Sequence, residues 1–252
     1  MIRAPIADLA PGERRLEGAI AHYLGRVLRL RADDPFIAFD PASGREAPGC
    51  VTKTDHDEIT VRFGELREGT ARAQRALTWI QGLAKGDKCD AVVRDATELG
   101  ATRILVATTE RSIVRLDATR ASNRQARWTR IAQEAARQCG RSQAPNVDAP
   151  CPWGDALARI PVDAARFCLW ERATMPLGPA LFEALARGAP LAFACGPEGG
   201  LESGEVELAL ESGWAIASLG ELVLRTETVA TAVLGAVCVF AGGLDWRIGS
   251  HR

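Results

Sequence analysis

Residues 191–200 read Leu-Ala-Phe-Ala-Cys-Gly-Pro-Glu-Gly-Gly, an apolar run that passes directly into a glycine-rich turn. Five apolar residues followed by turn residues predict a buried strand that ends at Cys195. Glycines at the turn let the backbone take positive φ and approach a ligand closely. A helix is expected at 203–212, so this stretch predicts one strand–loop–helix unit of an α/β domain.

A second unit of the same kind lies nearer the carboxyl terminus. The strand expected at 215–219 runs into Gly-Glu-Leu-Val-Leu-Arg-Thr-Glu-Thr, residues 220–228, which opens the apolar helix expected at 229–240. Helix N-termini present free N–H groups. Loops at the carboxyl ends of strands in one open sheet form a ligand crevice. The two loops therefore predict a binding site, although the chain contains neither G-x-G-x-x-G nor G-x-x-x-x-G-K-[ST].

The pattern of residues 73–245 predicts an α/β domain with a parallel sheet. Further strands are expected at 76–80, 104–107 and 167–170, and further helices at 89–99, along the apolar face of Trp128 and Ile131, and at 179–187. Gly188 and Gly213 are expected to end helices. Residues 146–161 are expected to form an irregular connection.

Residues 1–70 have a different pattern, that of short strands separated by turns. Strands are expected at 23–30, 36–39, 49–54 and 58–63, with Asp55-His56-Asp57 as a hairpin turn between the last two. A small β-barrel is the natural closure for such strands.

The composition is that of a soluble globular protein, with 47% hydrophobic and 25% charged residues in a chain of 252. The net charge of −1 excludes a globally basic nucleic-acid binder. Seven cysteines without a C-x-x-C pair argue against a disulfide framework or a zinc site. The N-terminus lacks a signal-peptide pattern, and the apolar run 229–241 is too short to span a bilayer. A cytoplasmic protein without a membrane segment is expected.

Arginine is concentrated in one part of the chain. Eight arginines and only two acidic residues, Asp117 and Glu134, lie between residues 111 and 141, a local balance of +6. This asymmetry is typical of contact with RNA phosphates. A solvated helix face is the alternative reading, and the pattern by itself leaves both open.

The chemistry available at the two loops is that of carboxylates and one arginine. The three histidines lie outside the expected α/β core, and no nucleophile motif or metal-ligand cluster is found. The ionisable loop side chains are Glu198, Glu221, Arg225 and Glu227. A carboxylate beside an arginine suits a base and a charge stabiliser. Each could instead cap a helix or form a structural ion pair.

Six motifs in order along the chain resemble the family that methylates N3 of a uridine in 16S ribosomal RNA, a family of the SPOUT class. The motifs are residues 22–30 (HYLGRVLRL), 85–88 (KGDK), 98–100 (ELG) with 110–112 (ERS), 138–141 (QCGR), 196–200 (GPEGG) and 224–228 (LRTET). Two departures occur, because the family usually has Lys at Asp95 and often Pro at Ala107. These departures lie outside the two loops and bear on helix packing or RNA contact.

The resemblance implies a knotted parallel-sheet methyltransferase domain preceded by a PUA-like barrel that binds RNA. Such a trefoil knot is an exception to the rule that chains do not thread loops. The resemblance also implies S-adenosylmethionine as cofactor, a homodimer, and the small ribosomal subunit as partner, with uridine 1498 of 16S rRNA as the family's target. No metal is implied.

The resemblance assigns roles to individual residues of this chain. Arg225 would stabilise charge on a uracil carbonyl oxygen, and Glu198 or Glu227 would take the N3 proton. The cofactor-binding residues would be Cys195, Gly196, Pro197, Glu198, Gly199, Gly200, Leu219, Gly220, Leu222, Leu224, Arg225, Thr226 and Thr228. The RNA-binding residues would be Arg26, Arg29, Arg111, Arg124, Arg127, Arg130 and Arg141.

Two other functions remain open at this point. One is a non-catalytic ribosome-assembly factor that keeps the fold and the RNA contacts, against which the intact 196–200 and 225–228 motifs argue. The other is a ribose 2′-O methyltransferase of the same fold, against which the Gln138–Arg141 segment argues.

Overall fold

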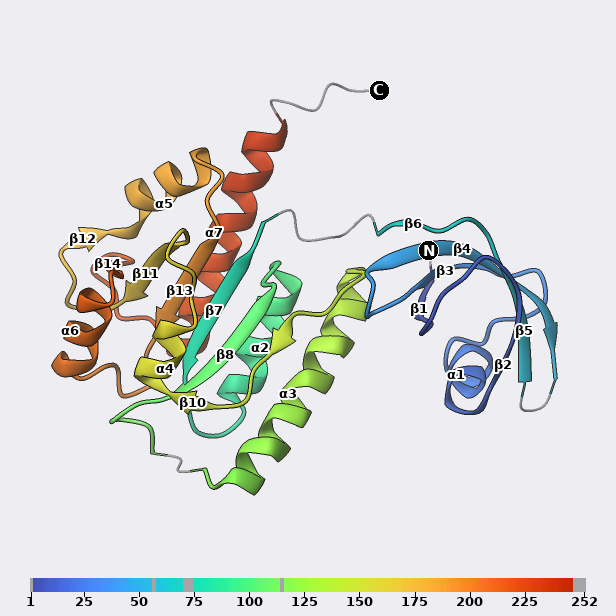
Figure 1. Cartoon of the computed structure of the whole chain (residues 1–252), viewed down its shortest axis with the longest axis horizontal. Helices are drawn as coiled ribbons and strands as arrows, with labels where there is room; N and C mark the ends of the chain where they lie inside the picture. Colours follow the sequence, from blue (N-terminus) through green and yellow to red (C-terminus); the bar gives the residue numbers. More distant parts are fainter. Residues whose placement is uncertain (1, 56–57, 70–74, 114–115, 247–252) are drawn as a thin grey trace. The chain divides into compact units, whose positions relative to one another are not determined.

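The computed structural model describes residues 2–55, 58–69, 75–113 and 116–246. The chain divides into two compact units (Figure 1). The first comprises Met1–Arg72 together with Gln133–Ala144, and the second comprises Ala73–Ala132 together with Pro145–Arg252. The end of the long arginine-rich helix thus belongs to the first unit. The domain limits expected at 70 and 73 lie within residues 70–74, outside the described residues, and stay predictions.

The first unit is built on a mixed sheet. Its strands are β1 (Arg3–Pro5), β2 (Gly12–Glu17), β3 (Pro35–Phe39), β4 (Arg45–Thr54), β5 (Glu58–Phe63) and β6 (Arg67–Glu68). The pairing follows β1-β3-β4-β5-β2, with β6 on β4, and only β1–β3 is parallel. Among the described residues β1 and β2 do not pair with each other, so they are the two edge strands of the sheet that was expected to close into a barrel. Alternate residues of β5, namely Ile59, Val61 and Phe63, are buried in its core.

The strand expected at 23–30 is wrong. The structure has α1 (Gly18–His22) continued by a π-helical turn, η1 (Tyr23–Val27). Its wide turn is seen in the hydrogen bond from Leu28 N to Tyr23 O at 2.9 Å. The physical reason is the helical spacing of Ile20, Leu24 and Leu28, which pack on the first unit's core, whereas Val27 is exposed. Residues 56 and 57 of the expected hairpin turn lie outside the described residues, but β4 and β5 pair antiparallel on either side of it.

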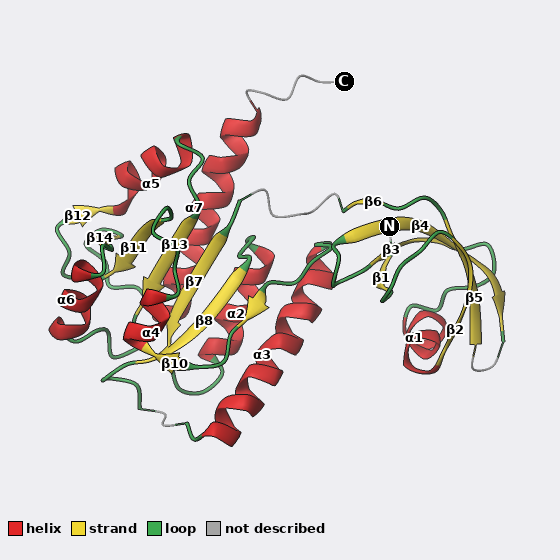
Figure 2. Ribbon diagram, viewed as in Figure 1, coloured by secondary structure: helices red, strands yellow, loops and turns green. Residues whose placement is uncertain are grey.

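The second unit contains a parallel sheet flanked by helices on both faces (Figure 2). The strand order is β10-β8-β7-β13-β11-β14-β12, with β9 on β8. The strands are β7 (Leu77–Gly82), β8 (Arg103–Thr108), β9 (Asn146–Val147), β10 (Cys151–Pro152), β11 (Ala165–Leu169), β12 (Met175–Pro176), β13 (Leu191–Cys195) and β14 (Ala215–Ser218). All five residues of β13 are buried, as expected for a parallel strand covered on both faces.

The helices form two layers that can be assigned from the two hydrophobic clusters of this unit. The helices are α2 (Lys88–Glu98), α3 (Ala118–Cys139), α4 (Trp153–Ala158), α5 (Leu177–Ala186), α6 (Ser203–Glu211) and α7 (Thr226–Trp246). Side chains of α2, α3, α5 and α7 pack with Trp79 and Phe193 on one face of the sheet. Side chains of α4 and α6 pack with Ile80 and Ala194 on the other face.

The sequence predicted most elements of this unit, but one expectation is wrong. Residues 146–161 are not an irregular connection, since they contain β9, β10 and α4. These elements are short, yet Trp153 and Leu157 are buried against the sheet, and that burial fixes the segment. Gly188 and Gly213 end α5 and α6 with φ of 70° and 78°, as predicted. The threading of the chain through a knot stays a prediction.

The two family departures fit this packing without strain. The Asp95 carboxylate on α2 accepts a hydrogen bond from Thr231 Oγ1 on α7 at 3.0 Å and pairs with Arg94. Ala107 is fully buried in β8, and its carbonyl accepts the Leu83 N–H at 2.7 Å. Both residues therefore serve packing within the second unit.

Candidate active site

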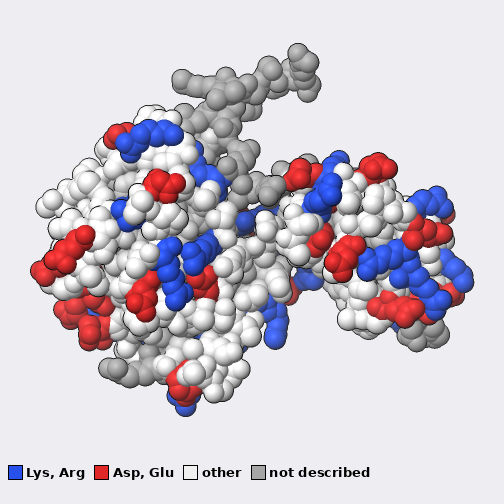
Figure 3. Space-filling view, viewed as in Figure 1, with Lys and Arg blue, Asp and Glu red and all other residues white. Residues whose placement is uncertain are grey.

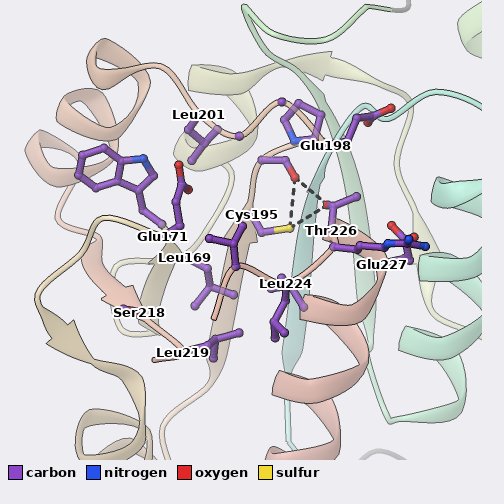
Figure 4. A pocket seen from close by; sticks show the side chains of 18 of the residues that line it. Leu169, Glu171, Cys195, Glu198, Leu201, Ser218, Leu219, Leu224, Thr226 and Glu227 are labelled. Carbon is purple, nitrogen blue, oxygen red and sulfur yellow. Dashed lines mark hydrogen bonds between the residues drawn. The ribbon is translucent and has the colours of Figure 1, made fainter. Parts of the chain in front are cut away.

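A cavity of about 410 Å³ opens at the carboxyl ends of β11, β13 and β14 and at the first turn of α7 (Figure 4). It is lined by Lys88, by residues 169–171, by 195–201, by 217–220, by 222–227 and by Val229. The strand ends meet there because parallel pairing aligns Leu169 and Gln81 with Cys195 on either side. Such an edge is where open α/β sheets bind ligands.

The first predicted loop, Gly196–Gly200, needs its glycines for close packing. A Cβ atom at Gly196 would lie 2.8 Å from the carbonyl carbon of Gly200, and Gly200 itself has φ of 74°. Behind the loop, a Cβ atom at Gly82 would lie 2.4 Å from Pro197 N. The loop is therefore pressed against the end of β7, and its backbone forms part of the cavity wall.

Arg111 holds this loop in place and is not free to bind phosphate. Its Nε donates to Glu202 Oε1 at 2.7 Å, and one terminal nitrogen donates to Gly199 O at 2.8 Å. The hydrogen bond to Glu202 raises the pKa of the arginine and lowers that of the glutamate. The side-chain carbon of Arg111 lies 3.2 Å from the position of a Cβ at Gly199. A larger side chain at Gly199 would therefore meet Arg111 first.

The second predicted loop presents apolar side chains and one cation. Gly220 has φ of 122°, and Ser218 Oγ donates to its carbonyl and accepts from its N–H, both at 3.1 Å. Leu222 and Val223 are 80% and 79% exposed. Arg225 is exposed, lines the cavity, and has no side-chain hydrogen bond or ion pair within the described part of the chain. It is thus a guanidinium available to a ligand.

The three carboxylates at the cavity have different surroundings. Glu198 Oε1 accepts the Lys85 N–H at 3.2 Å and lies 3.7 Å from Lys88 Nζ. Glu227 has one buried carboxylate oxygen, Oε2, without a hydrogen-bond partner in the described residues. Glu171 is exposed and lies on the other side of the cavity, next to Leu201 in Figure 4. Glu198 is therefore engaged by a cation, whereas Glu227 has acceptor capacity left.

Buried polar groups join the two loops beneath the cavity. Thr226 Oγ1 donates to Gly196 O at 2.7 Å, and Cys195 Sγ lies 3.5 Å from Thr226 Oγ1, contacts that Figure 4 marks with dashed lines. Gln81, also fully buried, donates to Thr226 Oγ1 at 2.7 Å. Burial raises the pKa of the Cys195 thiol to about 12, although its hydrogen bonds with Thr226 and Gln81 lower it.

The structure gathers nearly all the predicted cofactor residues around one cavity. Of those residues, only Thr228 lies outside the lining, exposed on α7. Sequence reasoning missed Gln81 and the loop Leu169–Glu171. The loop could have been found, because the strand expected at 167–170 belongs to the same parallel sheet and its carboxyl end shares the edge. Glu221 does not line the cavity either.

The predicted RNA-binding arginines fall into two groups. Arg111, Arg127 and Arg141 are engaged or buried: Arg127 donates twice to Asp90 Oδ2, at 2.9 and 2.5 Å, and Arg141 is only 7% exposed. Arg29 and Arg130 are exposed, without a side-chain partner in the described residues, and Arg26 is also exposed. Arg124 makes one long contact, to Gly86 O at 3.5 Å. Acidic residues of other elements, such as Asp90 and Glu202, therefore reduce the excess charge that the sequence suggested.

The visible surface agrees with this more even charge distribution. Figure 3 shows Lys and Arg side chains interspersed with Asp and Glu rather than one continuous basic area.

Among the described residues, no group of three or more His, Cys, Asp or Glu could hold a metal ion. In the same residues, no helix has the length and apolar character needed to cross a bilayer.

Comparisons with known proteins define the class. A family model described as "RNA methyltransferase domain" matches residues 71–238, and one described as "RNA methyltransferase PUA domain" matches residues 16–64. Together with the parallel sheet and the cavity at its edge, these matches define an RNA methyltransferase with an N-terminal PUA domain.

Individual relatives define the family. The ribosomal RNA small subunit methyltransferase E of Synechocystis is 32% identical over 228 residues, which cover 88% of this chain and 71% of that protein. The protein of the same name from Mycobacterium tuberculosis is 31% identical, over 91% of this chain and 87% of that protein. The crystal structure of the Neisseria gonorrhoeae protein of that name, bound to S-adenosyl methionine, superposes with a TM-score of 0.82 at 28% identity, over 94% and 96% of the two chains. The chain belongs to the ribosomal RNA small subunit methyltransferase E family.

The buried thiol at the cavity gives a testable prediction. Cys195 is 4% exposed with a pKa raised to about 12, so it stays protonated and inaccessible at neutral pH. We expect iodoacetamide to alkylate the exposed Cys139 in the native protein and to leave Cys195 unmodified. Peptide mass analysis after brief labelling measures both sites, and unfolding in denaturant serves as the control that makes Cys195 reactive. Equal native labelling of the two thiols would contradict the burial described here.

Proposed function

We propose that this protein uses S-adenosylmethionine to methylate N3 of a specific uridine in the 16S rRNA of the small ribosomal subunit. The observation that carries the proposal is the cavity formed by the Gly196–Gly200 and Leu219–Thr226 segments in a chain of this family. The small-subunit rRNA is supported by the names of the relatives. The uridine and its N3 atom are supported by the resemblance of the two loop motifs.

The residues present at the cavity fit this cofactor. The volume of about 410 Å³ lies within the range usual for small-molecule sites, about 300–1,000 Å³. Leu169, Leu201, Leu219 and Leu224 supply apolar surface suited to a purine, and the glycine loops leave backbone groups accessible. When bound, S-adenosylmethionine supplies an electrophilic methyl group, so the protein's task is positioning and proton transfer.

Arg225 is the proposed charge stabiliser for the uracil. Loss of the N3 proton places negative charge on the ring nitrogen and the adjacent carbonyl oxygens. A guanidinium that donates to such an oxygen stabilises the anion as it forms. Arg225 suits this role because it lines the cavity and no side-chain partner holds it within the described residues.

Glu227 is the proposed base, in preference to Glu198. The carboxylate of Glu198 already accepts the Lys85 N–H and lies 3.7 Å from Lys88 Nζ, so part of its acceptor capacity is in use. Glu227 lines the same cavity from the first turn of α7 and keeps one carboxylate oxygen without a donor. It can therefore accept the N3 proton, directly or through a water molecule.

RNA binding is assigned to the exposed arginines and the PUA-like unit. The target base must leave its stack to enter the cavity. Arg130, Arg26 and Arg29 are exposed and would contact phosphates along the flanking RNA. The protein would act in the cytoplasm, where small subunits are assembled.

A homodimer is also proposed. Val239 and Phe240 on α7 are 71% and 45% exposed, and Leu222 and Val223 near the cavity are 80% and 79% exposed. Exposed apolar side chains of this kind mark association surfaces. Light scattering of the purified chain that gave a monomer mass would contradict this assignment.

The first prediction concerns methyl transfer itself. We expect the protein to transfer one labelled methyl group from S-adenosylmethionine to N3 of a single uridine in small-subunit rRNA, located by mass mapping. Arg225→Ala should slow single-turnover transfer by about 10²–10³-fold, the usual cost of losing one stabilising donor. Cofactor affinity should change little, because this interaction strengthens only in the transition state.

Its control is Arg187→Ala, an exposed arginine at the end of α5 that pairs only with Glu183 among the described residues. Transfer by Arg225→Ala at the control's rate would remove Arg225 from the mechanism. Methylation of a ribose hydroxyl, or no methylation at all, would instead overturn the proposed function.

The second prediction separates the two carboxylates. Glu227→Gln keeps the shape and removes the base, so single-turnover transfer should fall by about 10²–10⁴-fold, the range attributed to general-base catalysis. Glu198→Gln should cost much less. Raising the pH should partly restore Glu227→Gln, since the N3 proton then leaves to solvent. The reverse order of the two variants in rate would assign the base to Glu198.

The third prediction separates free from partnered arginines. Arg130→Gln should reduce the slope of log K against log salt for RNA binding by about 0.7–0.9, the value for one phosphate contact. Arg127→Gln should change the slope less, because Asp90 already binds that guanidinium. Filter binding at several salt concentrations measures both slopes. If Arg130→Gln left the slope unchanged, α3 would be a solvated surface.

A further inference from the structure

Gln81 is a buried amide that reaches both loops of the cavity without lining it. It is the penultimate residue of β7, is fully buried, and pairs in the sheet with Cys195. Its Nε2 donates to Thr226 Oγ1 at 2.7 Å, to Gly82 O at 3.0 Å and to Gly196 O at 3.3 Å. Its Oε1 accepts Trp79 Nε1 at 3.1 Å. Hydrogen bonds at both the Nε2 and the Oε1 atom therefore fix the orientation of the amide.

The Gly196 carbonyl is the common acceptor of this group. Thr226 Oγ1 donates to it at 2.7 Å and Gln81 Nε2 at 3.3 Å, so hydrogen bonds from two elements hold the orientation of this carbonyl. The peptide bond that follows this carbonyl is planar, so the orientation of the carbonyl fixes the Gly196–Pro197 peptide plane. Fixing the Gly196 carbonyl therefore fixes the direction in which the Gly196–Gly200 loop leaves β13.

Gly82 restricts the same loop by contact. Because a Cβ atom there would lie 2.4 Å from Pro197 N and 2.6 Å from Gly196 C, the loop rests directly on the β7 backbone. The adjacent residues Gln81 and Gly82 thus act together, one through hydrogen bonds and one through close packing. They come from the start of the α/β unit, more than a hundred residues before the loop.

We propose that Gln81 is a positioning residue for cofactor binding, acting through the Thr226 hydroxyl and the Gly196 carbonyl. These three residues link the end of β7, the loop after β13 and the first turn of α7. The two loops that form the walls of the cavity are thereby held at a fixed distance from each other. The group is fully hydrogen-bonded, which is the condition under which a buried polar network specifies a single arrangement. This inference rests on the proposed cofactor and adds the residue that holds its site in shape.

The test measures cofactor affinity rather than activity. Gln81→Met keeps the approximate shape but leaves Trp79 Nε1 and Thr226 Oγ1 without their partner. Thr226→Val removes the hydroxyl at nearly constant volume. We expect each variant to bind S-adenosylmethionine and S-adenosylhomocysteine about tenfold or more weakly in calorimetry, the effect of losing a buried hydrogen bond. The double variant should lose little more than either single one, because both act on one carbonyl.

Thr226→Ser provides the conservative variant, since it keeps the hydroxyl and should bind the cofactor more tightly than Thr226→Val. Thr97→Val is the matched control for a buried threonine: Thr97 is fully buried on α2, donates to Val93 O at 2.7 Å and does not line the cavity. It should lower the melting temperature without weakening cofactor binding. A merely structural role of Gln81 would give the same pattern as this control.

The outcomes are distinct. If the wild-type protein binds both ligands and folded Gln81→Met binds them equally well, the inference is wrong and the proposed function stands. If Gln81→Met does not fold, Thr226→Val against Thr226→Ser decides, and equal affinity of these two overturns the inference. If the wild-type protein binds neither ligand, the proposed function fails and the inference with it.

Discussion

The parallel pairing of β13 with its two neighbours is the constraint on which the site depends. Cys195, the last residue of β13, is aligned with Gln81 of β7 on one side and with Leu169 of β11 on the other. Because parallel strands end at a common edge, the segments that follow β11, β13 and β14 meet there. A register shift of one residue would turn the side chains of β13 to the opposite faces and remove Cys195 from the buried polar group.

Several arginines of this protein are paired with carboxylates of the same chain, whereas two ionisable side chains at the cavity keep atoms without partners. Arg111 supports the Gly196–Gly200 loop through Gly199 O and is paired with Glu202, and Arg127 is bound by Asp90. Among the described residues, the Arg225 side chain and the Oε2 atom of Glu227 have no partner, and both residues line the cavity. Since exposed ion pairs stabilise little, these pairings matter mainly because they determine which groups stay available.

The sequence and the structure differ where local pattern and tertiary packing compete. The strand expected at 23–30, one of a series of short strands separated by turns, is wrong because the spacing of Ile20, Leu24 and Leu28 is helical and the core selects it. Residues 146–161 lack a periodic pattern, so their short elements are fixed only by the burial of Trp153 and Leu157. The arginine excess of residues 111–141 could not be weighed from sequence, because Asp90 and Glu202 lie elsewhere in the chain.

By itself, the sequence determined the α/β class, the positions of both glycine-rich loops and the family, because these depend on local periodicity, turn chemistry and contiguous motifs. It also identified Arg225, Glu198 and Glu227 as the candidate reactive groups. Only the tertiary structure decided which carboxylate is already partnered, which arginines are free, and that Gln81 joins the two loops. Those properties depend on side chains that lie far apart in the sequence, 37 residues for Arg127 and Asp90 and 145 for Gln81 and Thr226, and they meet only in the folded chain.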